Sequence, residues 1–560
     1  MAVTQIPNEL IEFGVKTFGT SSIMLGDTTT GTIDAANYNT GLGVDIFAAL
    51  TSGDNNTAVG FSALSANNTG FNNTAVGYTA LQDNTTGGQN VAVGSRVLPD
   101  NTTGDGNVGV GEATLFVNTT GNRNIALGLG VLQNSNSDDN IGLGNRSMHN
   151  ITSGVSNVAI GTDSLFTATT VDNQVAIGYY ALRLSSSGTL NTAVGYAALQ
   201  ANTSGDSNTA VGYRPLDSNT TGNGNTAMGR GAMFYNTTGG ENTSIGQEAL
   251  ANNTTADNNV AMGYYAAKSV TTGASNTAIG TKAMENATTA AQNVAVGRAL
   301  WSGTCTGYDN VAIGFDAGKA LTSGHSNVII GKDAADDSTT GTFNTVIGVV
   351  AGTAMTTAND CTIVGRNAGA SISTGGANTL LGYSAGSAIT TGDRNIIIGK
   401  GANIASGTDY RSISINTMEA SGKGSHTFFI SAGTGAGNGY QGNNSSSWAT
   451  TSDRRIKKNI VENTDGLNKI EQIQVKNFEY KTKEEITDWS GDDIDSVVVE
   501  KEGTQLGVIA QEIQEILPDV VNERENGCLS VDPDNITWYL VNAVKELSAE
   551  VKQLKQKLGE

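Results

Sequence analysis

This 560-residue chain has few cysteines, no long apolar run and no excess of basic charge, and each of these features excludes a class of protein. The three cysteines, Cys305, Cys361 and Cys528, are scattered and odd in number, so they form neither a disulfide framework nor a set of metal ligands. No segment is long and apolar enough to span a membrane, and the first residues lack the pattern of a signal peptide. Acidic residues outnumber basic ones by 52 to 31, which argues against nucleic-acid binding. We therefore expect no metal, no cofactor, no nucleic acid and no membrane insertion.

Aromatic residues and proline are also scarce, whereas glycine is abundant. Only 6% of the residues are aromatic and 5 are proline, against 72 glycines. Charged residues make up 15% of the chain, so much of the surface must be uncharged. Such a composition excludes a large aromatic core and favours the burial of small residues by stacking.

A pentapeptide repeat organises most of the chain. The pentapeptide Asn56-Thr57-Ala58-Val59-Gly60 recurs with substitutions along the chain. Its glycine recurs every 17 residues from Gly26 to Gly399, with one step of 16 between Gly128 and Gly144. Of these 23 glycines, 20 have an asparagine four residues earlier. A period this short does not accommodate a helical hairpin, but it fits one coil of a β-solenoid. We predict an all-β fold, a parallel β-solenoid (β-roll) with one coil per 17 residues over residues 21–416.

The alternation of side chains along each strand predicts which residues face the interior. The positions three and one before the glycine carry Val, Ile, Leu, Met or Thr and share one face, which we expect to point into the coil. The opposite face, with Ala and the glycine itself, would let another backbone or chain approach closely. The asparagine column predicts a ladder of stacked amides. Asn-Thr-Thr-Gly, as at residues 84–87, predicts a turn in which Gly or Asn supplies a positive φ.

Two variants of the coil follow each other along the chain. From Leu64 onward the residue four after the glycine is mostly Leu or Met, whereas from Gly318 onward it is Gly or Ala. The smaller residue predicts a rod that narrows towards its C-terminal end. Tyr179, Tyr196 and Tyr213 follow the glycine in three successive coils, which predicts a stacked column. Two interpretations of that column remain open, an exposed packing ladder and a platform for sugars.

The segments on either side of the repeat differ from it in composition. Residues 452–560 hold 37 of the 83 charged residues, which marks a new domain. We therefore divide the chain into an N-terminal cap or attachment segment (1–20), the solenoid shaft (21–416), a distal tip or linker (417–451) and a C-terminal domain (452–560).

The C-terminal domain is predicted to contain two helices. The first runs from Val508 to Ile516 and ends before Pro518. Further on, apolar residues recur at alternating spacings of four and three, the a/d pattern of a coiled coil: Leu540, Val544, Leu547, Val551, Leu554 and Leu558. This stripe either packs against its own domain or joins several chains. Its place at the end of the chain favours self-association.

Several motifs of this domain resemble a known family. In order, they are Thr451-Ser452-Asp453-Arg454-Arg455-Ile456-Lys457-Lys458-Asn459-Ile460, Gly507-Val508-Ile509-Ala510-Gln511-Glu512, Leu517-Pro518 and Ser530-Val531-Asp532. They resemble the endosialidase-type intramolecular chaperone, which forms the C-terminus of bacteriophage tail fibres, tail spikes and neck appendages. The resemblance implies a small α+β domain that helps three chains wind into a homotrimer and then cuts itself away.

The same resemblance implies a cleavage site between Thr451 and Ser452, with Ser452 as the nucleophile. Lys457 would accept the serine proton if burial or the neighbouring cations favour its neutral form. Without the resemblance, the basic run would be the solvated start of a helix, with Ser452 or Asp453 as its N-cap. At most, the chain is an autocatalytic serine peptidase with a Ser–Lys dyad that acts once on itself.

The function predicted from these features is that of a structural and host-recognition fibre of a phage tail. Residues 1–20 would attach it to baseplate or tail proteins, and residues 400–451 would bind a glycan or protein receptor on the bacterial host. The protein would belong to the virion after assembly in the host cytoplasm. One alternative is a polysaccharide-degrading tail spike, for which Asp138-Asp139 and Asp336-Asp337 are the paired carboxylates on offer. Another is a bacterial trimeric surface adhesin, because the repeat also resembles the β-roll head of trimeric autotransporter adhesins, which has shorter coils.

Overall fold

The computed structural model describes residues 14–18, 21–26, 35–416, 425, 427–431, 439–441, 454–487, 499, 503–523 and 527–559. The chain divides into two compact units, Met1–Thr451 and Ser452–Glu560. Within the described ranges, none of the helices combines the length and the hydropathy needed to cross a membrane.

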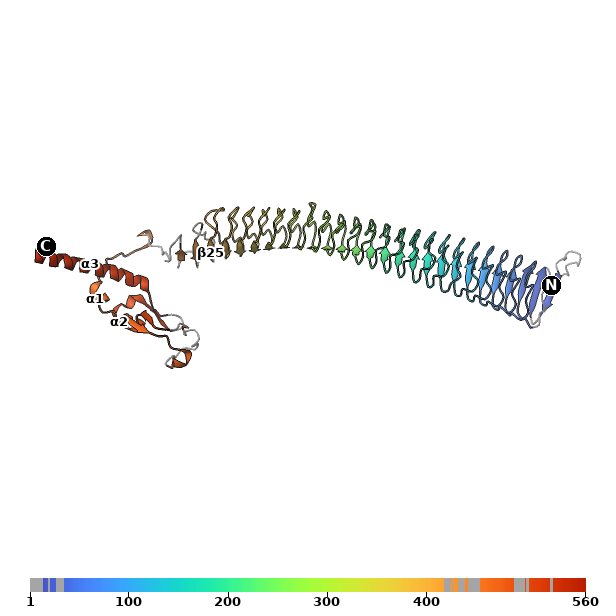
Figure 1. Cartoon of the computed structure of the whole chain (residues 1–560), viewed down its shortest axis with the longest axis horizontal. Coiled ribbons are helices and arrows are strands. Elements are labelled where there is room, and N and C mark those ends of the chain that lie inside the picture. Colours follow the sequence, from blue (N-terminus) through green and yellow to red (C-terminus); the bar gives the residue numbers. More distant parts are fainter. Residues whose placement is uncertain are drawn as a thin grey trace, which may run out of the picture. The chain divides into compact units, whose positions relative to one another are not determined.

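One sheet runs through the first unit with the predicted period. Its short strands follow one another at an offset of 17 residues, and each pairs in parallel with the next, as Thr57 does with Thr74 and Val59 with Val76. Figure 1 shows the successive coils stacked along the unit, with the strands on one side and the turns on the other. The prediction of a parallel β-solenoid is confirmed.

The strands of this sheet have the following bounds: β1 (Gly14–Phe18), β2 (Ser22–Gly26), β3 (Thr40–Gly43), β4 (Thr57–Val59), β5 (Thr74–Val76), β6 (Val91–Val93), β7 (Val108–Val110), β8 (Ile125–Leu127), β9 (Ile141–Leu143), β10 (Val158–Ile160), β11 (Val175–Ile177), β12 (Thr192–Val194), β13 (Thr209–Val211), β14 (Thr226–Met228), β15 (Thr243–Ile245), β16 (Val260–Met262), β17 (Thr277–Ile279), β18 (Val294–Val296), β19 (Val311–Ile313), β20 (Val328–Ile330), β21 (Thr345–Ile347), β22 (Thr362–Val364), β23 (Thr379–Leu381), β24 (Ile396–Ile398), β25 (Ile413–Asn416), β26 (Phe428–Ser431) and β27 (Gly439–Gln441).

The two ends of the sheet differ from its middle. β1 pairs antiparallel with β2 and so covers the edge of the first parallel strand. At the other end, β26 continues the parallel stack after β25, and β27 pairs antiparallel with β26. The parallel sheet therefore extends one strand beyond residue 416, where the sequence analysis ended the shaft.

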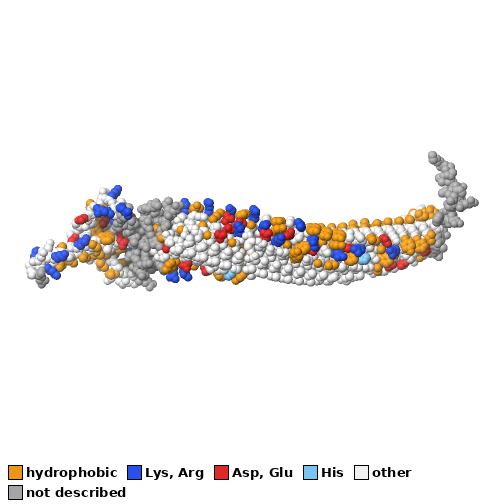
Figure 2. All heavy atoms as spheres, turned by 90° about the horizontal axis from the view of Figure 1, so that it is seen from above, with side chains coloured by type: hydrophobic (Ala, Val, Ile, Leu, Met, Phe, Trp, Pro, Cys, Tyr) orange, Lys and Arg blue, Asp and Glu red, His pale blue; other side chains and the backbone are white. Residues whose placement is uncertain are grey.

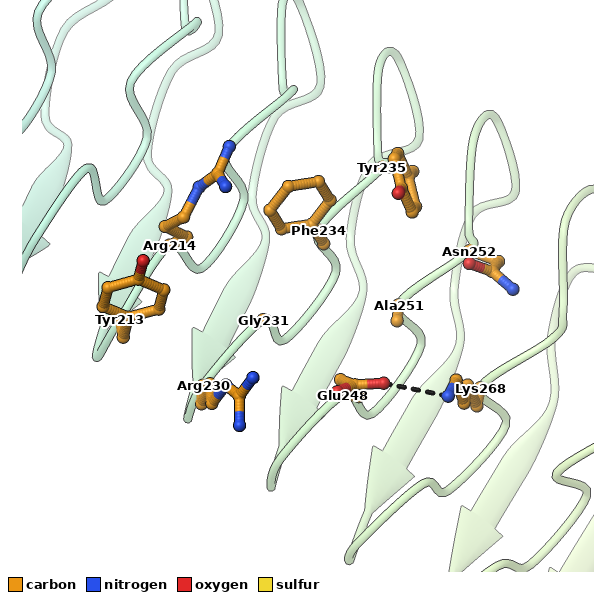
Figure 3. A pocket seen from close by; sticks show the side chains of 10 residues that line it. All are labelled: Tyr213, Arg214, Arg230, Gly231, Phe234, Tyr235, Glu248, Ala251, Asn252 and Lys268. Carbon is orange, nitrogen blue, oxygen red and sulfur yellow. Dashed lines mark ion pairs between the residues drawn. The ribbon is translucent and has the colours of Figure 1, made fainter.

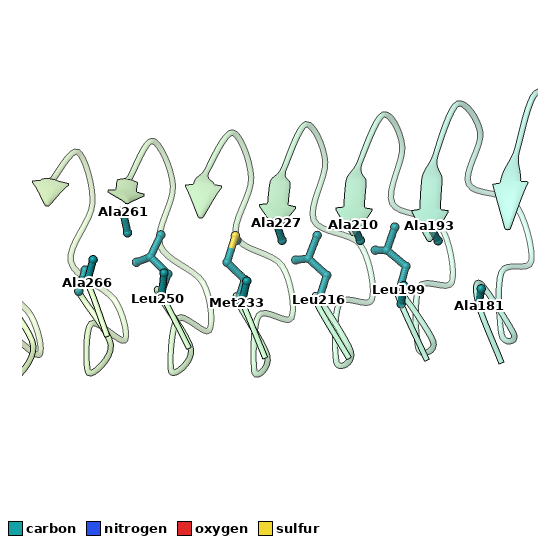
Figure 4. Close-up of a cluster of buried hydrophobic side chains, with 14 of the residues drawn as sticks. Ala181, Ala193, Leu199, Ala210, Leu216, Ala227, Met233, Leu250, Ala261 and Ala266 are labelled. Atoms are coloured by element: carbon teal, nitrogen blue, oxygen red, sulfur yellow. The ribbon is translucent and has the colours of Figure 1, made fainter. Parts of the chain in front are cut away.

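The middle residue of each three-residue strand, which is small in most coils, lines the interior, so the predicted orientation of the strands is wrong. Ala58 and its counterparts two residues before each glycine are fully buried, whereas the residues on either side are half-buried or exposed. Figure 4 shows the large side chains that face these alanines from the turns, among them Leu199, Leu216 and Met233. Because the turn already fills the narrow coil with a large side chain, the strand has space only for a small one.

The repeat glycine is required by the next coil of the same chain. At Gly60 φ is +136°, and a Cβ built there would lie 2.3 Å from the carbonyl oxygen of Gly77. The same close approach recurs along the stack, for example between Gly195 and Gly212. The glycine column therefore allows the close approach of another backbone, as predicted, and that backbone belongs to the next coil of the same chain.

Positive φ angles occur at other positions than those predicted. Neither Asn84 nor Gly87 of the Asn-Thr-Thr-Gly turn has one. The left-handed residues lie five before, two after and four after each glycine, as Asn72, Thr79 and Leu81 do, at φ of 56°, 52° and 52°. Most of them are not glycine, so the sequence carries little signal for these bends.

Two columns of buried asparagines join adjacent coils. In the predicted column, the backbone N–H of Asn56 donates to Oδ1 of Asn39 at 2.8 Å, and its Nδ2 donates to the carbonyl of Gly70 at 2.9 Å. The second column runs through the Asn-Thr-Thr-Gly turns, where Nδ2 of Asn84 donates to Oδ1 of Asn67 at 2.7 Å. Since these amides are fully buried, their hydrogen bonds satisfy them and fix the stacking of one coil on the next.

The coil of 16 residues keeps the strands in register by shortening a turn. β8 and β9 pair residue for residue at this smaller offset, Ile125 with Ile141. Asn136 stands where other coils have two threonines, and its Oδ1 accepts hydrogen bonds from the backbone N–H groups of Thr119 at 3.0 Å and Thr120 at 2.9 Å. In other coils a threonine carbonyl accepts such bonds. An asparagine side chain thus replaces a missing backbone carbonyl.

The C-terminal coils exchange the sizes of two facing residues. In the coils of Gly348 and Gly365, the residue four after the repeat glycine is Gly (Gly352 and Gly369), and the residue two before the repeat glycine is large (Val346 and Ile363). Both large residues are buried, and a Cβ at Gly352 would lie 3.3 Å from Cγ1 of Val346. The prediction of a narrower rod was based on the turn residue alone. Because the strand restores the lost volume, the smaller turn residue does not by itself thin the core.

The second unit is a small α+β domain around one long helix. Its elements are η2 (Arg454–Ile456), α1 (Leu467–Ile470), β28 (Lys476–Phe478), η3 (Lys483–Glu485), β29 (Gln505–Gly507), α2 (Ala510–Ile516), η5 (Pro518–Val520), β30 (Val521–Glu523), β31 (Leu529–Val531) and α3 (Pro533–Leu558). The predicted first helix is α2, which begins two residues later than expected and ends before Pro518.

Contacts between distant parts of the sequence hold this domain together. Ile513, Leu517, Val520 and Tyr539 form its core, and Oη of Tyr539 donates to Oδ2 of Asp519 at 2.7 Å. These contacts pack the start of α3 against α2 and η5.

Candidate assembly surfaces and cleavage segment

The outer face of the shaft sheet carries an uninterrupted apolar column. The residue before the repeat glycine is Val, Ile, Leu or Met in every coil from Val59 to Ile398, and Ile415 continues the column before Asn416. These side chains point away from the coil interior: Val93 is 37% exposed, Met228 42% and Leu381 49%. Figure 2 shows hydrophobic side chains gathered in lengthwise bands on the shaft, beside broad areas of uncharged polar surface.

A second outward column runs beside the first, three residues before the glycine. It consists of Thr, Val and Ile, so the outer face from β4 to β24 has no charged side chain. At strand spacing this face is roughly 95 Å long and about 7 Å wide, or about 700 Å². Monomeric proteins rarely expose a contiguous apolar patch of more than about 600 Å², and a stable interface buries about 800 Å² per partner. The face that the sequence analysis placed inside the coil is therefore a candidate contact surface.

The apolar stripe of α3 is not covered by its own domain. The domain buries Tyr539 and Ala543 on another side of the helix. All six residues predicted for trimerisation are exposed, from 43% at Val551 to 75% at Leu558: Leu540, Val544, Leu547, Val551, Leu554 and Leu558. Of the two interpretations of this stripe, packing within the domain does not describe it, and a surface of this pattern can join parallel helices.

The predicted cleavage segment is described only in part. Thr451 and Ser452 lie outside the described residues, so their geometry with respect to Lys457 is not defined. Lys457 follows η2 and is exposed, and its backbone N–H donates to the carbonyl of Arg454 at 3.3 Å. The side chain of Lys457 is therefore not buried in the single chain.

The two carboxylate pairs considered for glycan hydrolysis have different surroundings. Arg123 lies between Asp138 and Asp139, with Nε 2.6 Å from Oδ1 of Asp139, and its hydrogen bond holds the pKa of Asp139 below the usual value. In the other pair, burial raises the pKa of Asp336. The ion pairs with Arg123 therefore give Asp138 and Asp139 a structural role in joining adjacent coils.

The edge of the shaft that follows the repeat glycines carries many aromatic and charged side chains. The predicted tyrosine column is present here: the ring centres of Tyr179 and Tyr196 are 5.5 Å apart, and those of Tyr196 and Tyr213 are 5.1 Å apart. Cations lie over other rings of this edge, such as Arg214 at 4.6 Å from the centre of Phe234. The tyrosine column was predicted from the sequence, but these cations over aromatic rings were not, because they occupy different positions in different coils.

Comparisons with known proteins support the resemblance drawn from the C-terminal motifs. Residues 452–522 match the family described as "Chaperone of endosialidase". Over 111 residues, the chain is 35% identical to the long tail fiber protein Gp37 of Enterobacteria phage K3 and, equally, to that of Enterobacteria phage T2. These alignments cover 19% of this chain and only 8% and 7% of the two relatives. The chain thus carries an endosialidase-type chaperone domain, and it resembles phage tail fibre proteins over a minor part of its length.

Proposed function

We propose that this chain is the subunit of a phage tail fibre in which three parallel copies pack the outer faces of their sheets around a common axis. The observation that carries the proposal is the outward column of Val, Ile, Leu and Met, which has no exception from Val59 to Ile415. Three copies would remove this column from water, since each sheet face is apolar or uncharged over its whole length. The chaperone family and the tail fibre relatives support the same function.

Alignment of the three copies is the task that we assign to the C-terminal domain. Identical coils can pair out of register at little cost, because a slip of one whole coil preserves each face. A trimer formed first by the exposed stripe of α3 would set the register before the shafts associate. Such a start replaces a search among three chains by a local one.

Self-cleavage would follow assembly. The hydroxyl of Ser452 would add to the carbonyl carbon of Thr451 as Lys457 accepts its proton. The C–N bond would then break, the amine of Ser452 would leave with the proton, and water would hydrolyse the resulting ester. Since Lys457 is exposed in the single chain, we expect its activation only in the assembled trimer. The product is a fibre of residues 1–451 without its chaperone.

The ends of the fibre have separate roles in this proposal. Residues 1–20 attach it to baseplate or tail proteins, and residues 400–451 meet the bacterial surface. The fibre is a component of the virion and is assembled in the cytoplasm of the host.

Sedimentation equilibrium of the full chain tests the assembly. We expect a mass of three chains, and a monomer would overturn the proposal. Lysine at Val194 and Val211, adjacent members of the outward column, should prevent shaft association. Lysine at Ser204 and Thr221, exposed turn residues of adjacent coils, is the matched control and should have little effect.

Denaturing gels test the cleavage. The assembled wild-type chain should yield fragments that end at Thr451 and begin at Ser452, whereas Ser452→Ala and Lys457→Ala should remain whole. Lys458→Ala is the control for loss of a neighbouring charge. A Ser452→Ala chain still cut at this bond would contradict the assignment of the nucleophile.

A further inference from the structure

A cavity opens on the aromatic edge of the shaft where two small residues interrupt columns of larger ones. Gly231 lies between Arg214 and Glu248 in the column two after the repeat glycine, and Ala251 lies between Phe234 and Lys268 in the column five after it. Adjacent coils otherwise place large side chains at these positions. The two interruptions leave a cavity of about 420 Å³, within the usual range for small-molecule sites.

Aromatic rings and charged side chains line this cavity, and Figure 3 marks the ion pair between Glu248 and Lys268. Tyr213, Phe234 and Tyr235 line it. Nη2 of Arg214 lies 3.0 Å from Asp217, and Nζ of Lys268 lies 2.9 Å from Glu248. These pairs hold Arg214 and Lys268 in place beside the cavity.

Tyr213 and Arg230 are the two lining residues best placed to meet a ligand. Tyr213 ends the tyrosine stack, because Arg230 occupies the next place in that column, so one face of its ring is not covered by a further tyrosine. Arg230 is exposed. In the part of the chain that the structure describes, its guanidinium has no ion pair with a carboxylate, unlike Arg214 and Lys268.

From this arrangement we infer that the cavity binds a carboxylated pyranose, the unit of an acidic bacterial polysaccharide. Aromatic faces pack against the C–H faces of sugar rings, and a guanidinium without a carboxylate partner binds a carboxylate with two parallel hydrogen bonds. Glu248 and Asn252 would accept hydrogen bonds from ring hydroxyls. The site rests on the proposed role in host recognition and adds to it a lateral contact on the shaft, far from residues 400–451 in sequence.

Binding of the full-length chain to an array of bacterial oligosaccharides, some with uronic acids and some neutral, tests the inference. We expect selective binding of the carboxylated members and a loss of at least about tenfold in Arg230→Gln, since a charge-assisted bond is removed. Tyr235→Ala should weaken binding as well. Arg298→Gln is the matched control, because Arg298 occupies the same column of another coil outside the cavity.

Three outcomes would overturn the site: equal binding of neutral and carboxylated sugars, an equal loss in Arg298→Gln, or binding of no member of the array. Adsorption of virions to host cells in the presence of the purified chain separates this failure from failure of the fibre proposal. If Arg230→Gln chains still compete for adsorption as well as the wild type does, the fibre function stands without the lateral site.

Discussion

The shaft and the C-terminal unit are held together by contacts of different range. In the shaft, hydrogen bonds between coils join residues about one coil apart, as Asn84 and Asn67 do. In the C-terminal unit, the backbone N–H of Leu467 donates to Oε2 of Glu546 at 2.7 Å, across 79 residues. The repeated contacts between neighbouring coils build a long shaft, but they are nearly the same in every coil and so do not distinguish one coil from another. The long-range contacts of the C-terminal unit each occur once. We infer that a repeating shaft needs a non-repeating domain to define its alignment.

Blocking the stacking of two coils should have the largest effect. In Gly195→Val the new Cβ would collide with the carbonyl of Gly212, at a φ of +128° that valine avoids. We expect a loss of more than about 4 kcal/mol, enough to prevent folding of the shaft. Gly106→Asn is the control, because other coils place asparagine at this left-handed position and the nearest atom to its Cβ is 3.7 Å away. Soluble yield and thermal unfolding measure both variants, and a Gly195→Val chain that folds normally would contradict this account.

Charging the stripe of α3 should separate alignment from shaft folding. Val544→Asp with Leu547→Asp would place carboxylates in the seam between three helices, and we expect association to weaken by roughly a hundredfold or more. The coils themselves should keep their β-rich circular dichroism, since their contacts lie within one chain. Lys552→Gln on the same helix should change neither property. If the double variant sediments as a trimer, the stripe does not set the assembly.

Exchanging residue sizes within one coil should have an intermediate effect and should be non-additive. Ala210→Ile overfills the coil at a cost of about 1–3 kcal/mol, and Leu216→Gly empties it at a cost of about 2–5 kcal/mol. The double variant reproduces the pairing found in the C-terminal coils, so it should lose less stability than the sum of both. Denaturant unfolding of the four chains measures the coupling. Strict additivity would show that the two positions do not share one space.

Breaking the Arg123–Asp139 pair should have the smallest effect. The arginine lowers the pKa of Asp139, so the pair stabilises the fold above the unfolded pKa of about 3.9, and this stabilisation is lost as the pH falls through the folded pKa. Arg123→Gln should melt slightly below the wild type at pH 7 and equally at pH 2. Lys476→Gln, which breaks an exposed pair with Glu512 in the C-terminal unit, provides the comparison. A larger effect at acid pH would contradict the sign of this linkage.

The sequence was sufficient to predict the period, the parallel stacking, the asparagine ladder and the helix before Pro518. It did not predict which strand face lies inside, because alternation defines two faces but does not say which one a neighbouring turn will fill. The burial of Ala58 follows from Leu64 across the same coil. The exchange between Gly352 and Val346 is visible in the sequence only when the two columns are read together. The cavity was missed because its signal is the local absence of side chains at Gly231 and Ala251.

The shortened turn at Asn136 makes one coil of the shaft different from its neighbours and so marks one position along it. If all coils were equal, one copy of the shaft could be displaced along another by any whole number of coils without changing their contacts. One coil with a different outline makes every such displacement detectable, because the odd coil of one copy would then lie beside a regular coil of the next. In a trimer packed through the sheet faces, this turn would oppose displacement wherever it meets a neighbouring copy, in addition to the alignment by the C-terminal domain.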